Sequence, residues 1–358
     1  MPLLARMLLS PLFIDIRAGA VKGLGDLLSD RRISADGHVA VAVGPGQGEQ
    51  LVAELGPALD NADVFMVRGG SLEAAGELQA DLRGKHYDAL VGIGGGRTLD
   101  VAKYAATRLA LPMVAVATNL AHDGIASPVS SLLHEGGKGS FGVGLPMAVV
   151  VDLDYVRRSP VRMVRSGVGD VVSNLSALAD WRLAADERGE QVDGLAGTFA
   201  RTAAEAILHR TDGVDSDDFL TALAEALVLS GMAMAAAGDS RPCSGSDHEI
   251  LHAIDVLFPG AGNHGELAGV GALFAFFLRG DERTGSLLDA CLRRHELPRL
   301  PADLGLSAEQ FTEAVVLAPS TRPDRFTILE HLDLSPAAVR ERVDAFVDAY
   351  GDRAPAGA

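Results

Sequence analysis

Four residues between positions 170 and 264 have the types and spacing of a metal-dependent site. Asp170 follows two glycines at the start of an apolar helical pattern, and His248 and His252 are four residues apart in another. In a helix, residues i and i+4 project from the same face, so these two imidazoles can address one point. His264 lies in a third segment, Gly-Asn-His-Gly-Glu. A carboxylate with two imidazoles is a typical ligand set for a catalytic divalent metal with open coordination positions.

Each of these residues also has a simpler structural explanation. Asp170, Ser246 and Asn263 lie where helix N-caps are preferred, and a histidine at a helix start is more often structural than a ligand. The joint pattern favours a metal site, while capping roles stay open for the individual residues. Six other histidines show no such glycine-rich setting and are assigned to the surface or to structural roles: His38, His86, His134, His209, His295 and His331.

A glycine run forms a second cluster able to do chemistry. Gly94, Gly95 and Gly96 lie between an apolar strand pattern and a helix expected to begin near Thr98. Consecutive glycines let backbone N–H groups approach a ligand, and a helix N-terminus favours an anion. The segment therefore predicts a cradle for a pyrophosphate. It is not the Rossmann GxGxxG pattern, and a tight strand-to-helix turn stays an alternative.

The elements that would position these residues change character midway along the chain. The first 150 residues alternate short Val/Ile-rich runs with helical patterns, which predicts a parallel sheet covered on both faces. Strands are expected at 12–16, 39–43, 64–67, 89–93 and 114–117, with helices at 47–59, 72–82 and 98–109. Residues 127–151 contain two strand-like runs around a turn-rich segment, and we expect a hairpin there.

After about residue 155 the pattern is helical almost throughout. The expected helices are 168–183, 194–208, 219–237, 249–257, 266–278 and 336–350. We therefore predict an α/β dinucleotide-binding domain over residues 1–155 and an all-helical metal- and substrate-binding domain over 156–358. In such pairs, ligands often bind near the carboxyl ends of the strands, in the crevice between the domains.

Composition and charge exclude several classes of protein. The 358 residues carry 31 Lys+Arg against 48 Asp+Glu, a net charge of −17, which disfavours nucleic acid and anionic lipid as partners. No run approaches the roughly 20 uninterrupted apolar residues of a membrane helix, so we expect no membrane insertion. Pro11 interrupts the apolar start of the chain, which disfavours a signal peptide. Only Cys243 and Cys291 are present, without a CxxC pair, and we expect a reduced, cytoplasmic location.

Five segments resemble, in the same order, motifs of the sn-glycerol-1-phosphate dehydrogenases: GIGGGRTLDVAKYAA, ATNLAHDGIASPVSSL, GVGDVVSNLSALADW, SGSDHEILHAID and GNHGELAGVG. That family belongs to the metal-dependent alcohol dehydrogenase and dehydroquinate synthase superfamily. The resemblance runs from about Leu12 to the last helices. It implies a dehydroquinate synthase-like fold, with a nucleotide-binding α/β domain, a helical domain and a metal in the cleft between them.

The resemblance implies contacts with a nicotinamide cofactor, NAD or NADP, for ten residues. They are Gly94, Gly95, Gly96, Arg97, Thr98, Thr118, Asn119, Leu120, Ala121 and Ser127. The chain reads TNLA where the family commonly has TAAS, so Ala121 supplies no hydroxyl. No acidic residue follows the strand expected at 39–43 to hold a ribose 2′-hydroxyl, which leaves NADPH open beside NADH.

The metal and substrate residues are implied in the same way. Asp170, His248 and His264 match the three metal ligands, and Asp170 also faces the substrate. Asp123 and His252 match substrate-contacting residues, so Asp123, Asp170 and His252 are the expected catalytic residues. A neighbouring aspartate, at position 247, stands where many members carry Glu.

The implied reaction is the reversible reduction of dihydroxyacetone phosphate to sn-glycerol 1-phosphate. A divalent metal would polarise the carbonyl and supply local positive charge in an acidic chain. We expect zinc ahead of nickel or iron, since this ligand set accepts each. A proton relay through His252 or Asp123 is a hypothesis. The group that binds the substrate's phosphate is open among Lys103, Arg165, Arg241 and Arg322, and a homo-oligomer is expected from the family.

Three alternatives remain at this level. The chain could be a dehydrogenase of another small hydroxy-phosphate or polyol, because the TNLA segment departs from the family pattern and a fold does not determine a substrate. It could be a sugar-phosphate cyclase of the dehydroquinate synthase type, although those enzymes carry further Lys and His around the metal. A catalytically silent binding protein is disfavoured by the joint presence of the metal-ligand pattern and the glycine run.

Overall fold

The computed structural model describes residues 9–35, 37–59, 61–135 and 137–351. The chain forms two compact units. The first contains the residues up to Val164 together with Asp212–Gly238, and the second contains Arg165–Thr211 and the residues from Asp239 onwards. This division differs from a single boundary at residue 155, because one long helix of the expected helical domain groups with the first unit.

The first unit is built on a six-stranded sheet in which every pair of neighbours is parallel, as predicted. Its order is β1 (Phe13–Arg17), β8 (Ala148–Asp152), β5 (Met113–Ala117), β4 (Ala89–Gly94), β2 (Val39–Val43) and β3 (Ala62–Met66). Every residue of β2, β4, β5 and β8 is buried. Their Val-, Ala- and Ile-rich sequences suit strands that are covered on both faces.

The expected hairpin pairs differently from the prediction. Strand β6 (Val129–His134) pairs antiparallel with β7 (Gly137–Gly142), while residues 148–152 enter the parallel sheet as β8 between β1 and β5. The prediction that 148–152 closes the hairpin is therefore wrong. The physical reason is composition, because the wholly apolar run AVVV suits a central strand, whereas the Gly-rich GKGSFG suits a short exposed one.

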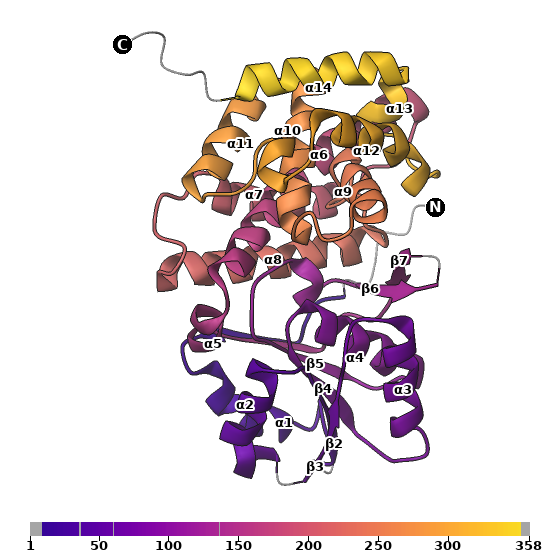
Figure 1. Cartoon of the computed structure of the whole chain (residues 1–358). Coiled ribbons are helices and arrows are strands. Elements are labelled where there is room, and N and C mark those ends of the chain that lie inside the picture. Colours follow the sequence, from indigo (N-terminus) through magenta and orange to yellow (C-terminus); the bar gives the residue numbers. More distant parts are fainter. Residues whose placement is uncertain (1–8, 36, 60, 136, 352–358) are drawn as a thin grey trace. The chain divides into compact units, whose positions relative to one another are not determined.

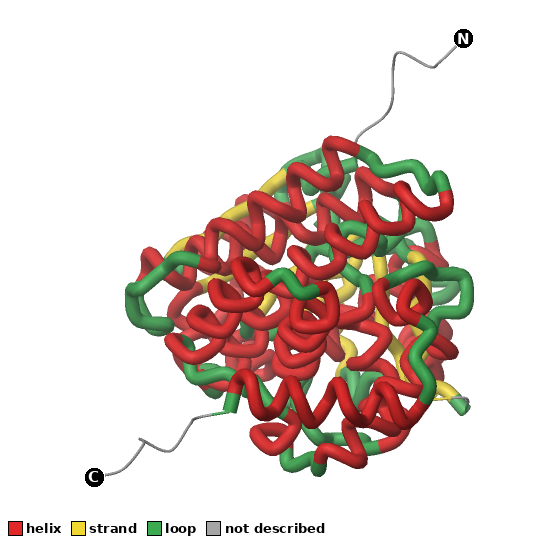
Figure 2. The backbone as a smooth tube through the Cα atoms, turned by 90° about the horizontal axis from the view of Figure 1, so that it is seen from above, coloured by secondary structure: helices red, strands yellow, loops and turns green. Residues whose placement is uncertain are grey.

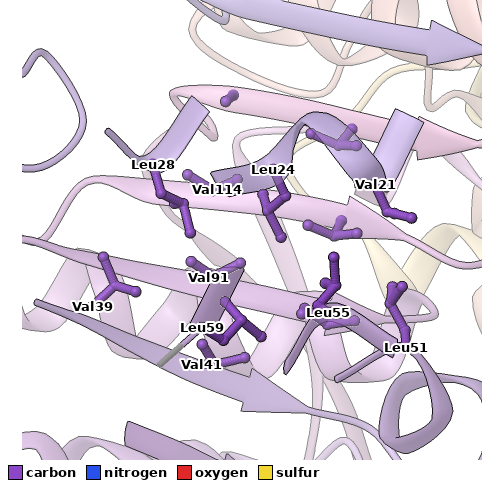
Figure 3. Packing of buried hydrophobic residues seen from close by; sticks show 14 of the residues in the cluster. Val21, Leu24, Leu28, Val39, Val41, Leu51, Leu55, Leu59, Val91 and Val114 are labelled. Atoms are coloured by element: carbon purple, nitrogen blue, oxygen red, sulfur yellow. The ribbon is translucent and has the colours of Figure 1, made fainter. Parts of the chain in front are cut away.

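Helices cover the sheet on its two faces (Figure 1). Leucines of α1 (Leu24–Leu28) and α2 (Gln47–Leu55) pack against valines of β2, β4 and β5 on one face (Figure 3). On the other face, α3 (Leu72–Leu82) packs against α4 (Gly96–Leu109), and α4 packs against β4 and β5. The shorter elements are η1 (Ala20–Gly23), η2 (Gly56–Leu59), η3 (Asp123–Ile125) and α5 (Leu153–Arg158).

The order of the strands reverses direction between β2 and β4. The connection from β2 leads outward to β3, whereas the connection from β4 leads the opposite way to β5. Helices α2 and α4 therefore leave the sheet on opposite faces. This is where open α/β sheets bind their ligands.

The long helix that groups with the first unit is α8 (Asp217–Ala237). A Cβ atom on Gly231 would lie 2.4 Å from the carbonyl oxygen of Ala126, so α8 lies against the chain that follows η3 with no side chain between them. By length and composition alone α8 could cross a membrane, but 61% of its most apolar window is buried inside the structure. A core helix passes the same test, so α8 is weak evidence for a membrane span.

The second unit is helical, and all the strands among the described residues belong to the first (yellow in Figure 2). Its elements are α6 (Val161–Arg188, which starts just before the unit), α7 (Gly194–Leu208), α9 (Ser246–Leu257), α10 (His264–Arg279), α11 (Glu282–Arg294), η4 (Pro301–Leu304), α12 (Ala308–Thr321), α13 (Ile328–Leu332) and α14 (Pro336–Tyr350). The sequence patterns did not predict α11, α12 or α13. Phe274 anchors the core, with ring centroids 5.3 Å from Phe311 and 5.2 Å from Phe346.

Candidate metal centre and cofactor loops

Helices α6 and α10 touch backbone to backbone through two glycines. A Cβ atom on Gly169 of α6 would lie 2.1 Å from the carbonyl oxygen of Gly265, and one on Gly265 would lie 1.7 Å from that of Ser166. No side chain fits at either position, so glycine is required for this close approach. Asp170 directly follows Gly169 and His264 directly precedes Gly265. The crossing therefore brings these two side chains together.

The start of α9 is held against the same two helices. The buried carboxylate of Asp180, on α6, accepts hydrogen bonds from the backbone N–H of Ser246 at 2.8 Å and from its hydroxyl at 2.7 Å. A Cβ atom on Gly271 of α10 would lie 2.6 Å from the carbonyl oxygen of Asp247. Burial raises the pKa of Asp180, which makes these donors important for its ionised form. Together the contacts position His248 in the first turn of α9.

Asp170, His248 and His264 offer three ligand atoms to one point. His248 Nε2 lies 3.2 Å from His264 Nε2, and Asp170 Oδ1 lies 3.4 Å from His264 Nε2 and 3.9 Å from His248 Nε2. In a tetrahedral zinc site with bonds of ~2.05 Å, ligand atoms are ~3.3 Å apart. Asp170 and His248 are buried, whereas His264 is partly exposed. The donor set and its spacing fit a divalent metal ion.

Asp247 supports this fit by orienting His248. Its Oδ2 contacts His248 Nδ1, and Asp247 is fully buried. Because the carboxylate accepts the Nδ1 proton, Nε2 of His248 carries a lone pair that faces His264 and Asp170. His264 Nε2 can therefore donate a hydrogen bond to His248 Nε2, or both atoms can ligate one cation. From the sequence, Asp247 was noted only because many family members carry Glu at this position. The structure shows that it contacts His248, a candidate metal ligand.

His252 lies on the same face of α9 but outside the ligand group. Its ring centroid is 6.3 Å from that of His248. Its Nε2 accepts a hydrogen bond from Arg322 Nη2 at 3.0 Å. Since an arginine can only donate, the imidazole is neutral in this contact and its remaining proton is on Nδ1. His252 is thus placed beside the three candidate metal ligands, with its Nδ1–H available for a hydrogen bond.

In the first unit, the glycine run meets the loop that follows β5. A Cβ atom on Gly95 would lie 2.4 Å from Asn119 Nδ2, and one on Gly96 would lie 2.1 Å from His122 Nε2. Gly94 ends β4, Gly95 is the N-cap and Gly96 begins α4, two residues before the start expected near Thr98. The N-terminus of α4, with its unpaired N–H groups and positive dipole end, opens beside these residues. The loop after β5 therefore lies against the glycine run, whose backbone N–H groups can bind an anion.

The other cofactor candidates surround this loop. Thr98 is buried, and its hydroxyl would lie 2.2 Å from a Cβ on Gly44, so the loop after β2 also meets the glycine run. Thr118 is buried and its N–H donates to the carbonyl of Gly94 at 3.0 Å. Leu120 is fully buried, so only its backbone can face a ligand. Arg97 is exposed, and Ala121 N–H donates to Asn119 Oδ1 at 3.3 Å.

His122 is a residue that the sequence reasoning did not single out. Its Nδ1 accepts the N–H of Gly124 at 3.0 Å, so a neutral ring carries its proton on Nε2, the atom nearest the glycine run. The sequence signal that could have identified it is its position directly before Asp123, in the segment ATNLAHDGIASPVSSL. The ring can therefore donate toward a ligand held at the glycine run.

Two further candidates of the first unit have different surroundings. The hydroxyl of Ser127 is buried and donates to the carbonyl of Val129 at 3.2 Å, which ties it to the base of the hairpin. Asp123 begins η3 and is partly buried. It belongs to the first unit, whereas Asp170 and His252 belong to the second.

Comparison with known proteins gives consistent matches. A family model described as iron-containing alcohol dehydrogenase matches residues 15–160. A glycerol-1-phosphate dehydrogenase of Archaeoglobus fulgidus, named for NAD(P)+, is 38% identical over 278 residues, which cover 75% of this chain and 78% of that protein. The enzyme of the same name from Methanosarcina mazei is 32% identical over 351 residues, covering 96% and 98%. A probable glycerol dehydrogenase from Sinorhizobium meliloti shares the fold, with a TM-score of 0.76 at 21% identity over 97% of this chain and 99% of that one.

Proposed function

The chain belongs to the glycerol-1-phosphate dehydrogenase family, and on that premise we propose that it reversibly reduces dihydroxyacetone phosphate to sn-glycerol 1-phosphate with NADH or NADPH. It is an NAD(P)-dependent oxidoreductase. The observation that carries the proposal is the convergence of Asp170, His248 and His264, whose ligand atoms all lie within 4.8 Å of one another. Carbonyl reduction requires such a centre or an equivalent electrophile.

Asp170, His248 and His264 would hold one divalent metal, which supplies Lewis acidity toward the carbonyl oxygen of the substrate. Zinc is our proposal, with nickel and iron as alternatives, since a carboxylate with two imidazoles accepts each. Asp247 holds His248 in the tautomer and orientation that coordination needs. The buried setting of Asp170 and His248 keeps these donors from water.

The chain also supplies groups that handle the proton. Reduction produces an alkoxide, which must receive one. His252 carries a proton on Nδ1, because its Nε2 accepts the hydrogen bond from Arg322. We propose that a water molecule hydrogen-bonded to the Nδ1–H of His252 passes this proton to the alkoxide, with Asp123 as the alternative relay.

The cofactor loops of the first unit suit a dinucleotide. Backbone N–H groups at Gly94–Gly96 and the N-terminus of α4 would bind its pyrophosphate. The nicotinamide supplies the hydride when it is bound. Thr98, Thr118 and Ser127 are buried beside these loops and would keep their shape.

Titration of NADH and NADPH oxidation with dihydroxyacetone phosphate, with and without a metal chelator, tests the proposal. We expect oxidation that the chelator abolishes, with sn-glycerol 1-phosphate as the product. Release of phosphate without net cofactor turnover would instead support a sugar-phosphate cyclase, and oxidation with another hydroxy-phosphate only would change the substrate. A protein that binds neither cofactor would contradict both enzymatic assignments.

We also propose a cytoplasmic, homo-oligomeric enzyme without membrane insertion. Cys243 and Cys291 are free and buried, which suits a reducing compartment. Light scattering coupled to size-exclusion chromatography would measure the oligomer. A mass of one chain at micromolar concentration would contradict the homo-oligomer.

A further inference from the structure

A buried ion pair of α4 takes no part in the chemistry described above. The side chain of Lys103 is fully buried, and its ammonium nitrogen lies 3.1 Å from Oδ1 of Asp100, one turn earlier in the helix. A lysine is almost never fully buried unless it is paired. Such a pair adds little net stability, because the cost of removing two charges from water offsets most of their attraction. A geometrical role therefore explains the pair better than stability does.

The ammonium group of Lys103 holds a second segment of the chain. It donates to the carbonyl oxygens of Ser127 at 3.2 Å and of Val129 at 2.5 Å. The hydroxyl of Ser127, which donates to the same Val129 carbonyl, lies 3.4 Å from the ammonium nitrogen. An ammonium group has three protons, and Asp100, Ser127 and Val129 offer an acceptor for each. Lys103 therefore attaches residues 127–129 to α4, and its protons are not directed at a substrate.

Two further contacts hold the same segment. The buried hydroxyl of Ser130 donates to the backbone carbonyl of Asp100 at 2.9 Å. A Cβ atom on Gly231 of α8 would lie 2.4 Å from the carbonyl oxygen of Ala126. Helices α4 and α8 belong to the same unit. Residues 126–130 are therefore held by both helices.

The chain just before this segment also lies on α4. A Cβ atom on Gly96, the first residue of α4, would lie 2.1 Å from Nε2 of His122. Gly96 and Lys103 are seven residues apart, close to two helical turns, so they share one face of α4 about 10 Å apart along its axis. The chain from His122 to Val129 thus follows one face of α4. It contacts Gly96 at its start and Lys103 at its end.

We propose, on the basis of the proposed function, that Lys103 is a positioning residue for the cofactor. Through its bonds to residues 127–129 it holds the chain around η3 on α4, so that Nε2 of His122 stays against the glycine run. The backbone N–H groups of that run and the His122 ring then keep the spacing that a pyrophosphate requires. Lys103 does not touch the cofactor, and carbonyl chemistry is left to residues of the second unit.

A purely structural role predicts a different result. Loss of a stabilising pair would lower the free energy of unfolding without moving residues 122–129 on α4 in the molecules that remain folded. Loss of a positioning pair weakens cofactor binding in the folded molecules. The candidate metal ligands belong to the second unit, so metal content should not follow the change in cofactor affinity.

Isothermal titration of NADH and NADPH into the full-length, metal-loaded Asp100→Asn/Lys103→Met variant tests the assignment. The double change removes both charges, so neither is left buried without its partner. We expect the dissociation constant of the cofactor to rise about 2- to 10-fold or more, since at least the His122 contact is lost, with metal content and kcat at saturating cofactor unchanged. Lys85→Met, the same change at an exposed lysine of the first unit, should bind as the wild type does. An unchanged dissociation constant in the double variant, or a parallel loss of metal, would overturn the assignment.

Hydrogen exchange provides a test that needs neither cofactor nor turnover. In the double variant, backbone amides of residues 122–131 should exchange about 10-fold faster or more, the effect of losing a hydrogen bond to a charged group, while those of β2 stay unchanged. If the double variant does not fold, Ser130→Ala, which removes one bond to the same segment, should show a smaller change of the same kind. Equal exchange of the segment in variant and wild type overturns the assignment. If the segment responds as expected but the wild type binds neither cofactor, the proposed function fails while the positioning of the segment by Lys103 stands.

Discussion

The Nε2 atoms of His248 and His264 lie 3.2 Å apart, although the two residues begin different helices. The position of each helix start relative to the other is determined by tertiary contacts and not by its local sequence. The position of His264 depends on the contact between Gly169 and Gly265, and that of His248 on the contacts of Asp180 and Gly271. The geometry of the candidate metal centre therefore depends on how closely three helix backbones approach.

Replacing Gly169 by Ala should disrupt the candidate metal centre, although Gly169 is not itself a candidate ligand. The new Cβ would meet the carbonyl oxygen of Gly265 at 2.1 Å, and such overpacking costs about 1–3 kcal/mol. We expect a lower free energy of unfolding and weaker metal binding, because α10 must move away with His264. Chemical denaturation and metal analysis would measure the two effects.

The matched control is Gly197→Ala in α7, where the nearest atom to a Cβ is 3.8 Å away. Alanine has the higher helix propensity, so this variant should be stabilised by about 0.5–1 kcal/mol. If Gly169→Ala were as stable and as rich in metal as this control, the backbone crossing would not limit the site.

Asp247→Asn should weaken metal binding while leaving the three ligands in place. The amide replaces the carboxylate that accepts the Nδ1 proton of His248. Loss of such a supporting partner lowers metal affinity about 10- to 100-fold. Competition with a chelator of known affinity would measure the change. Glu341→Gln, an exposed change on α14, should leave the affinity at the wild-type value, and an equal affinity in Asp247→Asn would contradict its orienting role.

Removal of the metal should lower thermal stability as well as activity. A ligand at 100 times its dissociation constant stabilises a protein by about 2.7 kcal/mol, so zinc should raise the melting temperature of the metal-free chain. His264→Ala and Asp170→Asn each remove one donor and should reduce that shift. A full shift in both variants would place the metal elsewhere. His331→Ala, outside the ligand group, is the control.

His122→Ala should weaken NADH or NADPH binding without changing the metal. The Nε2 proton of His122 faces the glycine run near Gly96, and losing one neutral hydrogen bond typically costs about 0.5–1.5 kcal/mol, or roughly 2- to 10-fold in affinity. Quenching of protein fluorescence by the cofactor would measure binding. Unchanged cofactor affinity would show that the ring only caps η3.

Cys291 should remain unreactive in the folded protein. Burial raises the pKa of its thiol to about 11, against a smaller opposing effect of Arg294. Since the folded pKa lies above the unfolded one, the protonated thiol contributes stability that is complete below the unfolded value and is lost as the pH rises through about 11. Iodoacetamide at pH 8.5 should modify no cysteine in the folded chain and both after denaturation. Rapid modification of the folded chain would contradict this.

Sequence patterns alone determined the class of the first unit. The apolar runs that form β2, β4, β5 and β8 are buried on both faces. Their Val-, Ala- and Ile-rich composition therefore predicts both that they are strands and that helices cover them. The same is true of the glycine run, because a strand, three glycines and a helix can make only a few local shapes. The residue types Asp, His and His likewise indicated a metal, since their chemistry is independent of the fold.

Tertiary structure alone decided which groups act together. The pairing of β6 with β7, the grouping of α8 with the first unit, and the contacts of Asp247 and Arg322 all join residues through packing. Local periodicity reports burial but not the partner, because a buried residue needs only an apolar neighbour of the right shape. A metal centre needs atoms placed to within tenths of an ångström, and here the close contacts of Gly169, Gly265 and Gly271 provide that placement.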